Sequence, residues 1–267
     1  MPDRFFKRDD VRLRYRDDGT GPAVMLLHGW ALDLQMWDLQ ARALCDRFRV
    51  IRLDRRGFGL SSGHPSVEQD VEDLSTLCGL LDIERVAIVG MSQGARAAVA
   101  FAQTHPRAVS CLVLDGPPDF DIDGTSDVPL ARYRELVRSQ GMDAFRHEWR
   151  RHPLTRLQSK DQEVRALLDA TIARYRGLDL LAPPSDAAAT PETRGLDSLQ
   201  VPVLVLYGDH ESPGRAAAAR ALAARLPNGR HVVIDRAGHM PNLDNPDSYN
   251  ALVRDFLSRH TAVLLTR

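Results

Sequence analysis

The sequence contains few of the features that mark membrane, secreted or metal-binding proteins. No apolar run approaches the roughly 18 residues that a membrane-spanning helix needs, and the first ten residues are too polar for a signal peptide. The 267 residues include only three cysteines, Cys45, Cys78 and Cys111, which lie far apart and form no CxxC pair. We therefore expect a cytoplasmic protein with buried free thiols, no membrane partner and no cysteine-based metal site.

Excess charge of either sign and cofactor motifs are also absent. The chain has 35 basic and 36 acidic residues, a net charge of −1, so no overall positive field would attract nucleic acid. It has no HExxH segment, no carboxylate cluster and no GxGxxG segment at the start of a helix. The sequence therefore predicts neither a metal nor a dinucleotide cofactor. The 43% apolar and 27% charged residues predict an ordinary globular protein with a large core.

Short apolar runs alternate with amphipathic stretches through most of the chain. The runs typical of buried strands are 24–27, 48–53, 86–89, 111–114, 203–206 and 231–234. The stretches with helical spacing are 34–45, 66–81, 93–104, 216–225 and 246–260. This alternation predicts an α/β protein whose mostly parallel sheet has helices on both faces.

The alternation is interrupted once. From residue 119 to about 176 there is no strand pattern, and helices are predicted at 128–139, 142–151 and 161–175, followed by a connector rich in Ala and Pro at 182–195. We therefore predict a core domain formed by residues 1–118 and 196–267, with a helical insertion at 119–195.

The segment from Gly90 to Gly94 matches GxSxG, a motif that can present a catalytic serine. An apolar strand pattern precedes it and a helix of small residues follows it, which is the setting in which this motif presents a nucleophile. Its glycines permit a sharp turn that exposes the Ser92 hydroxyl, and the following helix N-terminus favours negative charge. We therefore predict that Ser92 is a catalytic nucleophile.

A serine nucleophile needs a base and a carboxylate that orients the base. Of nine histidines, His239 follows a predicted strand in a glycine-containing turn and comes after Ser92 in the chain, as this motif requires. Three carboxylates are candidates for its partner. Asp209 and Glu211 follow the 203–206 run, and Asp115 ends the run after the nucleophile helix.

An oxyanion hole requires backbone N–H groups that face the developing negative charge. The residue after the nucleophile, Gln93, supplies one such group. The second is predicted from the loop after the first long strand, His28-Gly29-Trp30-Ala31, where the N–H of Trp30 is the natural donor.

These motifs together resemble the α/β-hydrolase fold family, in the branch with a helical cap. The resemblance runs from about residue 12 to 260 and rests on the segments 28–30, 54–61, 90–94, 208–211 and 238–239. It implies that the 119–195 insertion is the cap. In the family the triad acid usually lies three residues after the loop glycine, which corresponds to Glu211 where the family usually has Asp. On this alignment Asp209 is a non-catalytic polar residue.

The resemblance implies a hydrolase with a small-molecule substrate but does not identify that substrate or the oligomeric state. Serine at position 92 argues against the dehalogenases and epoxide hydrolases of the family, which attack with Asp. The expected reaction is hydrolysis of a small ester, lactone or thioester through an acyl-enzyme, or cleavage of an activated C–C bond.

One alternative is a cofactor-free dioxygenase that cleaves a heteroaromatic ring, which Asp115 as the acid would fit. The other is a ligand receptor with a vestigial triad. We expect Arg96 to have a structural role and the basic segment 145–152 to be a solvated helix face.

Overall fold

A computed structural model describes residues 2–120, 128–182 and 195–261. Its strands are β1 (Arg4–Arg8), β2 (Val11–Asp18), β3 (Ala23–Leu27), β4 (Arg49–Leu53), β5 (Val86–Met91), β6 (Val109–Asp115), β7 (Val203–Gly208) and β8 (Gly229–Ile234). They form one eight-stranded sheet in the order β1-β2-β4-β3-β5-β6-β7-β8, parallel from β4 to β8 and antiparallel at the β1–β2 edge. The predicted fold class, a mostly parallel α/β sheet, is confirmed.

The central strands are the ones that the sequence predicts. Every residue of β5, β6 and β7 is buried, as expected of parallel strands covered by helices on both faces. The sequence analysis missed β1 and β2, because Arg and Asp interrupt their apolar pattern. β1 forms the edge of the sheet, and β2 lies between β1 and β4, where Arg14 and Asp18 are buried in ion pairs with Asp54 and Arg52.

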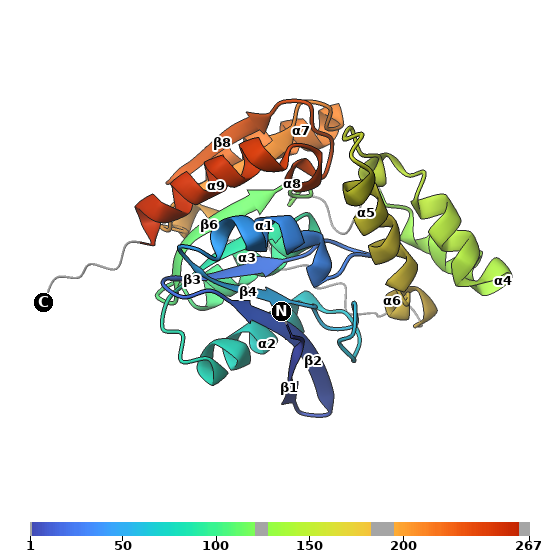
Figure 1. Ribbon diagram of the computed structural model, residues 1–267, viewed down its shortest axis with the longest axis horizontal. Helices are drawn as coiled ribbons and strands as arrows, with labels where there is room; N and C mark the ends of the chain where they lie inside the picture. The colour runs from blue at the N-terminus through green and yellow to red at the C-terminus, as the bar shows by residue number, and fades with distance from the viewer. Residues whose placement is uncertain (1, 121–127, 183–194, 262–267) are drawn as a thin grey trace, which may run out of the picture.

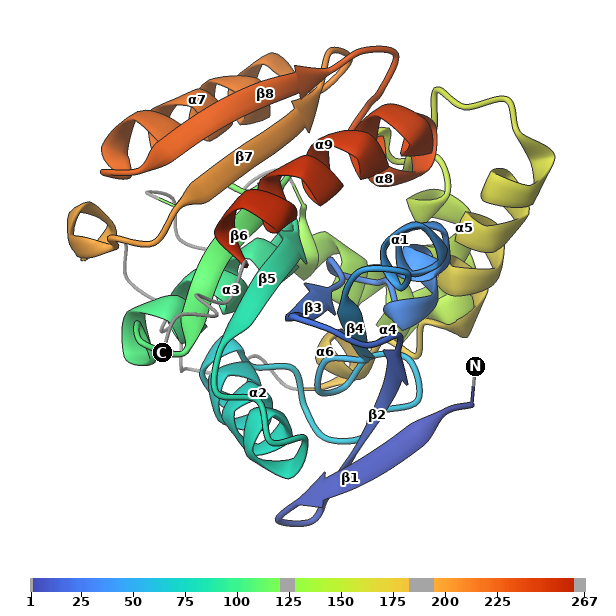
Figure 2. The ribbon, with the colours of Figure 1, turned by 60° about the vertical axis from the view of Figure 1, so that its left-hand side comes forward.

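Helices cover both faces of the sheet. The helices α1 (Asp38–Leu44) and α9 (Pro246–His260) share one apolar core on one face, and α9 is seen crossing the sheet in Figure 2. A second core on the other face contains α2 (Val67–Leu80), α3 (Gln93–Thr104) and α7 (Pro213–Arg225). Helix α2 begins as predicted after Ser66, whose hydroxyl accepts a hydrogen bond from the N–H of Gln69 at 3.3 Å.

The chain between β6 and β7 forms the helices α4 (Leu130–Trp149), α5 (Gln162–Arg174) and α6 (Leu178–Leu181). They gather at one end of the molecule, beyond the sheet (Figure 1). The two helices predicted at 128–139 and 142–151 form the single element α4, which is interrupted at Gly141, where φ is +83°. The predicted connector at 182–195 lies almost entirely outside the described residues, so the limits of the cap remain a prediction.

Four short elements complete the fold. They are η1 (Leu34–Trp37), η2 (Pro153–Thr155), η3 (Leu196–Ser198) and α8 (Pro241–Asp244). Among residues 2–120, 128–182 and 195–261, no helix combines the length and apolar character needed to cross a bilayer.

Candidate active site

Ser92 lies on a strained turn between β5 and α3. Its φ of +50° and ψ of −117° fall in a region that residues with a side chain rarely adopt. A Cβ at Gly90 would lie 2.4 Å from the carbonyl oxygen of Gly94, and one at Gly94 would lie 2.4 Å from the carbonyl oxygen of Leu27. Only glycine fits at these two positions, so the motif is required by the backbone that presents Ser92.

His239 and Glu211 come from two loops that follow neighbouring strands. Glu211 follows β7, His239 follows β8, and the His239 Nδ1 lies 2.6 Å from the Glu211 Oε2. Both side chains are almost fully buried, with 4% and 3% of their surface exposed. Although burial opposes ionisation, the positive charge and hydrogen bond of His239 lower the pKa of Glu211. Glu211 is therefore a carboxylate at neutral pH, placed to stabilise an imidazolium.

Asp209 has a different role, although it lies in the same loop. Its Oδ1 accepts a hydrogen bond from the N–H of Ala237 at 2.9 Å and lies 2.7 Å from the His210 Nδ1. Although desolvation favours the neutral acid, hydrogen bonds from the backbone of Ala237 and Arg236 lower the pKa of Asp209 to about 2. Asp209 therefore braces the loop that carries His239.

Asp115, the third candidate acid, is fully buried at the end of β6. It lies beside the phenol of Tyr249, yet neither carboxyl oxygen has a hydrogen-bond partner within the described residues. Burial, reinforced by the nearby negative charge of Glu211, raises the pKa of Asp115 well above its ordinary value. Asp115 is therefore a neutral acid, and the carboxylate at the Nδ1 of His239 belongs to Glu211.

We expect Asp115→Asn to gain stability relative to the wild type as the pH rises. In the unfolded chain Asp115 loses its proton near pH 4, whereas in the folded protein it keeps it, so wild-type stability falls above that pH. Asparagine is neutral in both states and removes this loss, which amounts to at most about 1.4 kcal/mol per pH unit. Urea unfolding between pH 4 and 8 measures the difference, and a pH-independent difference would contradict a buried neutral acid.

The loop that contains Trp30 lies against Ser92. A Cβ at Gly29 would be 3.3 Å from the Ser92 Cβ, so glycine permits this close approach. His28 is fully buried, with its Nδ1 2.7 Å from the Gly29 carbonyl oxygen, and its Nε2 accepts a hydrogen bond from the N–H of Arg55 at 2.9 Å. Burial and the charge of Arg55 lower the pKa of His28 to about 3. His28 is therefore a neutral residue that fixes the loop.

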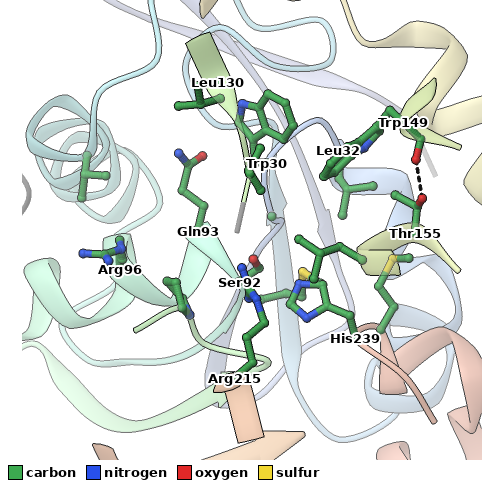
Figure 3. Close-up of a pocket in the computed structure, with 17 residues that line it drawn as sticks. Trp30, Leu32, Ser92, Gln93, Arg96, Leu130, Trp149, Thr155, Arg215 and His239 are labelled. Atoms are coloured by element: carbon green, nitrogen blue, oxygen red, sulfur yellow. Dashed lines mark hydrogen bonds between the residues drawn. The ribbon is translucent and has the colours of Figure 1, made fainter. Parts of the chain in front are cut away.

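Ser92 and His239 line a cavity of about 150 Å³ beneath the cap helices. Figure 3 shows both at its floor, with the guanidinium of Arg215 directed toward Ser92 and Trp30 and Trp149 above them. The apolar wall consists mainly of Trp30, Leu32, Met91, Val128, Leu130, Trp149, Leu154 and Met240. The predicted oxyanion donors, Trp30 and Gln93, both line this cavity. The site is therefore an apolar chamber with polar groups converging at its floor.

Two arginines also reach the cavity, and no carboxylate lines it within the described part of the chain. Arg215, in the first turn of α7, is 6% exposed, and its Nη1 donates to the Gly116 carbonyl at 3.2 Å. Sequence reasoning missed it, because the charged residues of this alanine-rich helix resemble a solvated face. Arg96, which the sequence analysis expected to be structural, donates from Nη2 to the Asp119 carbonyl at 2.5 Å and lines the same cavity.

The basic cap segment 145–152 divides between two environments. Phe145 and Trp149 are buried against Trp30, at ring-centroid distances of 5.7 and 4.8 Å. The arginines lie outside this cluster, for example Arg150, whose Nε lies 3.2 Å from Asp169. The aromatic residues therefore form the roof of the site.

The sheet order, the turn at Ser92 and the His239–Glu211 pair together define a protein of the α/β-hydrolase type. The chain belongs to the alpha/beta hydrolase fold family, whose model matches residues 22–246. The chain is 29% identical to the 2-hydroxy-6-oxononadienedioate/2-hydroxy-6-oxononatrienedioate hydrolase of Paraburkholderia xenovorans (strain LB400), over 93% of this chain and 91% of that protein.

Solved structures of esterases and lactonases are similar along nearly the whole chain. An esterase from Thermogutta terrifontis, determined with malate bound, is 28% identical with a TM-score of 0.82, over 98% of this chain and 100% of that one. The enol-lactonase from Burkholderia xenovorans LB400 is 26% identical with a TM-score of 0.78, over 96% and 100% of the two chains.

Proposed function

We propose that this protein is a serine hydrolase that cleaves small esters, lactones or related acyl compounds through an acyl-enzyme. The observation that carries this proposal is the 2.6 Å contact between the His239 Nδ1 and the Glu211 carboxylate, because His239 lines the same cavity as Ser92. The named activities of the similar esterase and lactonase structures support the same reaction class.

The proposed reaction follows from these positions. Ser92 Oγ attacks the substrate carbonyl carbon while the Nε2 of His239 accepts the serine proton, and Glu211 stabilises the resulting imidazolium. The N–H groups of Trp30 and Gln93 stabilise the oxyanion. His239 then protonates the leaving group, and water hydrolyses the acyl-enzyme in the reverse sequence of proton transfers.

A fluorophosphonate probe and a substrate panel test this proposal. The probe should label the protein at Ser92, because the activated hydroxyl attacks phosphorus as it would attack a carbonyl carbon. Esters of graded acyl length and a set of lactones should identify the preferred substrate. Labelling that persists in Ser92→Ala would contradict Ser92 as the nucleophile, and binding of these compounds without turnover would favour the receptor alternative. The dioxygenase alternative is less favoured. It would require Asp115 as the acid beside the His239 Nδ1, and the carboxylate at that nitrogen is Glu211.

A second proposal concerns the substrate, which we infer to carry a carboxylate. Arg96 and Arg215 place two guanidinium groups at the cavity, and buried guanidinium groups bind carboxylates strongly. The similar esterase was determined with malate bound, and the hydrolase relative is named for a dioate. Malate and the dioate are both dicarboxylates, which supports an anionic substrate here.

We expect Arg215→Met to reduce the preference for an anionic ester over a neutral one. The 4-nitrophenyl monoester of glutaric acid and 4-nitrophenyl pentanoate form a matched pair of equal acyl length. The ratio of their kcat/KM values should fall by about 10- to 100-fold, the range for one lost charge-assisted hydrogen bond. Arg220→Met, an exposed arginine of the same helix, is the control and should leave the ratio unchanged. An unchanged ratio in Arg215→Met would contradict this assignment.

A further inference from the structure

The side chain of Trp30 belongs structurally to the cap, although its backbone belongs to the core. The Trp30 Nε1 donates a hydrogen bond to the Asp179 Oδ2 at 2.6 Å, and the hydroxyl of Tyr175 donates to the other oxygen of the same carboxylate. Asp179 lies in the short helix α6 of the cap. A single cap carboxylate therefore holds both the indole and a neighbouring cap side chain.

Aromatic packing reinforces this attachment. The Trp30 ring makes edge contacts with Trp149, Tyr175 and Phe145, at centroid distances of 4.8, 5.6 and 5.7 Å. Only 7% of Trp30 is exposed, so its indole is a buried part of the cap's apolar core. Displacing the cap would therefore displace the indole or leave it without its packing partners.

The backbone of the same loop lies next to the nucleophile at Gly29, where a Cβ would be 3.3 Å from the Ser92 Cβ. Gly29 brings this loop within van der Waals distance of Ser92. Ala31, the next residue after Trp30, has a φ of +58°, in the left-handed region that disfavours residues with a Cβ. Local preference therefore does not maintain this loop conformation, and surrounding contacts must hold it.

We infer that Asp179 is a positioning residue that fixes the oxyanion-binding N–H of Trp30 by anchoring its indole to the cap. This inference rests on the proposed serine hydrolase function. Asp179 does not touch the substrate but acts through Trp30. The cap thereby completes the catalytic site through a hydrogen bond, in addition to covering the cavity.

Asp179→Leu tests the inference. Without its acceptor the indole is less well held, so the N–H is misplaced and kcat should fall about 10- to 100-fold, with KM changed less than about threefold. Affinity for a trifluoromethyl ketone, which forms an oxyanion adduct with Ser92, should fall by the same factor as kcat. Asp179→Asn retains an acceptor oxygen and should restore most of the activity. If Asp179→Leu does not fold, Trp30→Phe removes the indole N–H instead and should show the same losses.

Arg174→Met is the matched control. The Nε of Arg174, a cap residue, lies 2.8 Å from the Asp33 carboxylate of the core, so this substitution also removes a cap–core ion pair but leaves Trp30 untouched. It should retain wild-type kcat. Unchanged kcat in Asp179→Leu, or an equal loss in Arg174→Met, would overturn the inference while leaving the hydrolase proposal intact. A wild-type protein that neither labels at Ser92 nor hydrolyses esters would overturn both.

Discussion

Glu211→Gln is expected to lower kcat by about 10³- to 10⁴-fold, the cost of removing the acid of a serine triad. The carboxylate lies 2.6 Å from the His239 Nδ1 and stabilises the charge that the imidazole acquires when it accepts the serine proton. Glutamine retains the shape but not the charge, and its amide can favour the wrong tautomer of the imidazole. Steady-state kinetics on the best ester of the panel measures the effect.

The other two candidate acids provide matched controls. Asp209→Asn removes a carboxylate that backbone N–H groups stabilise, so we expect a loss of stability, but kcat should change little because Asp209 is not the partner of the His239 Nδ1. Asp115→Asn replaces an acid that is already neutral, so kcat should change less than about threefold, within the effect of a small local adjustment. A large loss of kcat in either variant, with wild-type rates in Glu211→Gln, would show that the acid has been misassigned.

His239→Ala should have the largest effect, a loss of about 10⁶-fold in kcat, as found when the base of a serine triad is removed. Without the imidazole, no group in the described part of the cavity is placed to accept the Ser92 proton. Activity of the wild type should also decline at acid pH, because a protonated imidazole cannot act as a base.

The neighbouring His210 provides the control for this measurement. Its side chain is about half exposed and lies beside Asp209. His210→Ala should therefore retain wild-type kcat within about threefold, as expected for an exposed substitution. Comparable losses in the two variants would mean that the loop as a whole, rather than one imidazole, determines the rate.

The sequence predicted the central sheet and the turn at Ser92, because each requires particular residues at particular positions. Fully buried strands need continuous apolar runs, and a turn such as that at Ser92 needs glycines at fixed offsets. The carboxyl ends of parallel strands share one edge of the sheet, so the residues after β5, β7 and β8 lie close together. Strand order and motif position therefore predicted that Ser92 and His239 would line one site, whereas the preference for Glu211 over Asp209 and Asp115 came from the resemblance to the family.

Contacts between segments that share no pattern could not be predicted in this way. The bond between Trp30 and Asp179 joins residues 149 positions apart, and nothing in either local sequence specifies the other. Arg215 lies in a helix rich in alanine whose charged residues resemble a solvated face. The strands β1 and β2 carry many charged side chains, some exposed and some buried in ion pairs, so they lack the apolar alternation that marks a strand.

The backbone conformation at Ser92 lowers the thermal stability of the protein, but it presents the hydroxyl that the proposed reaction needs. A serine with a φ of +50° is less stable there than glycine, which adopts this conformation without steric cost. Selection for resistance to heat alone would therefore favour glycine at position 92 and would eliminate the hydroxyl. The protein must offset this local penalty elsewhere, through the buried central strands and the glycines around the turn. If the activity were no longer selected, replacement of Ser92 by glycine would raise stability at the cost of activity, which is a trade-off between stability and activity.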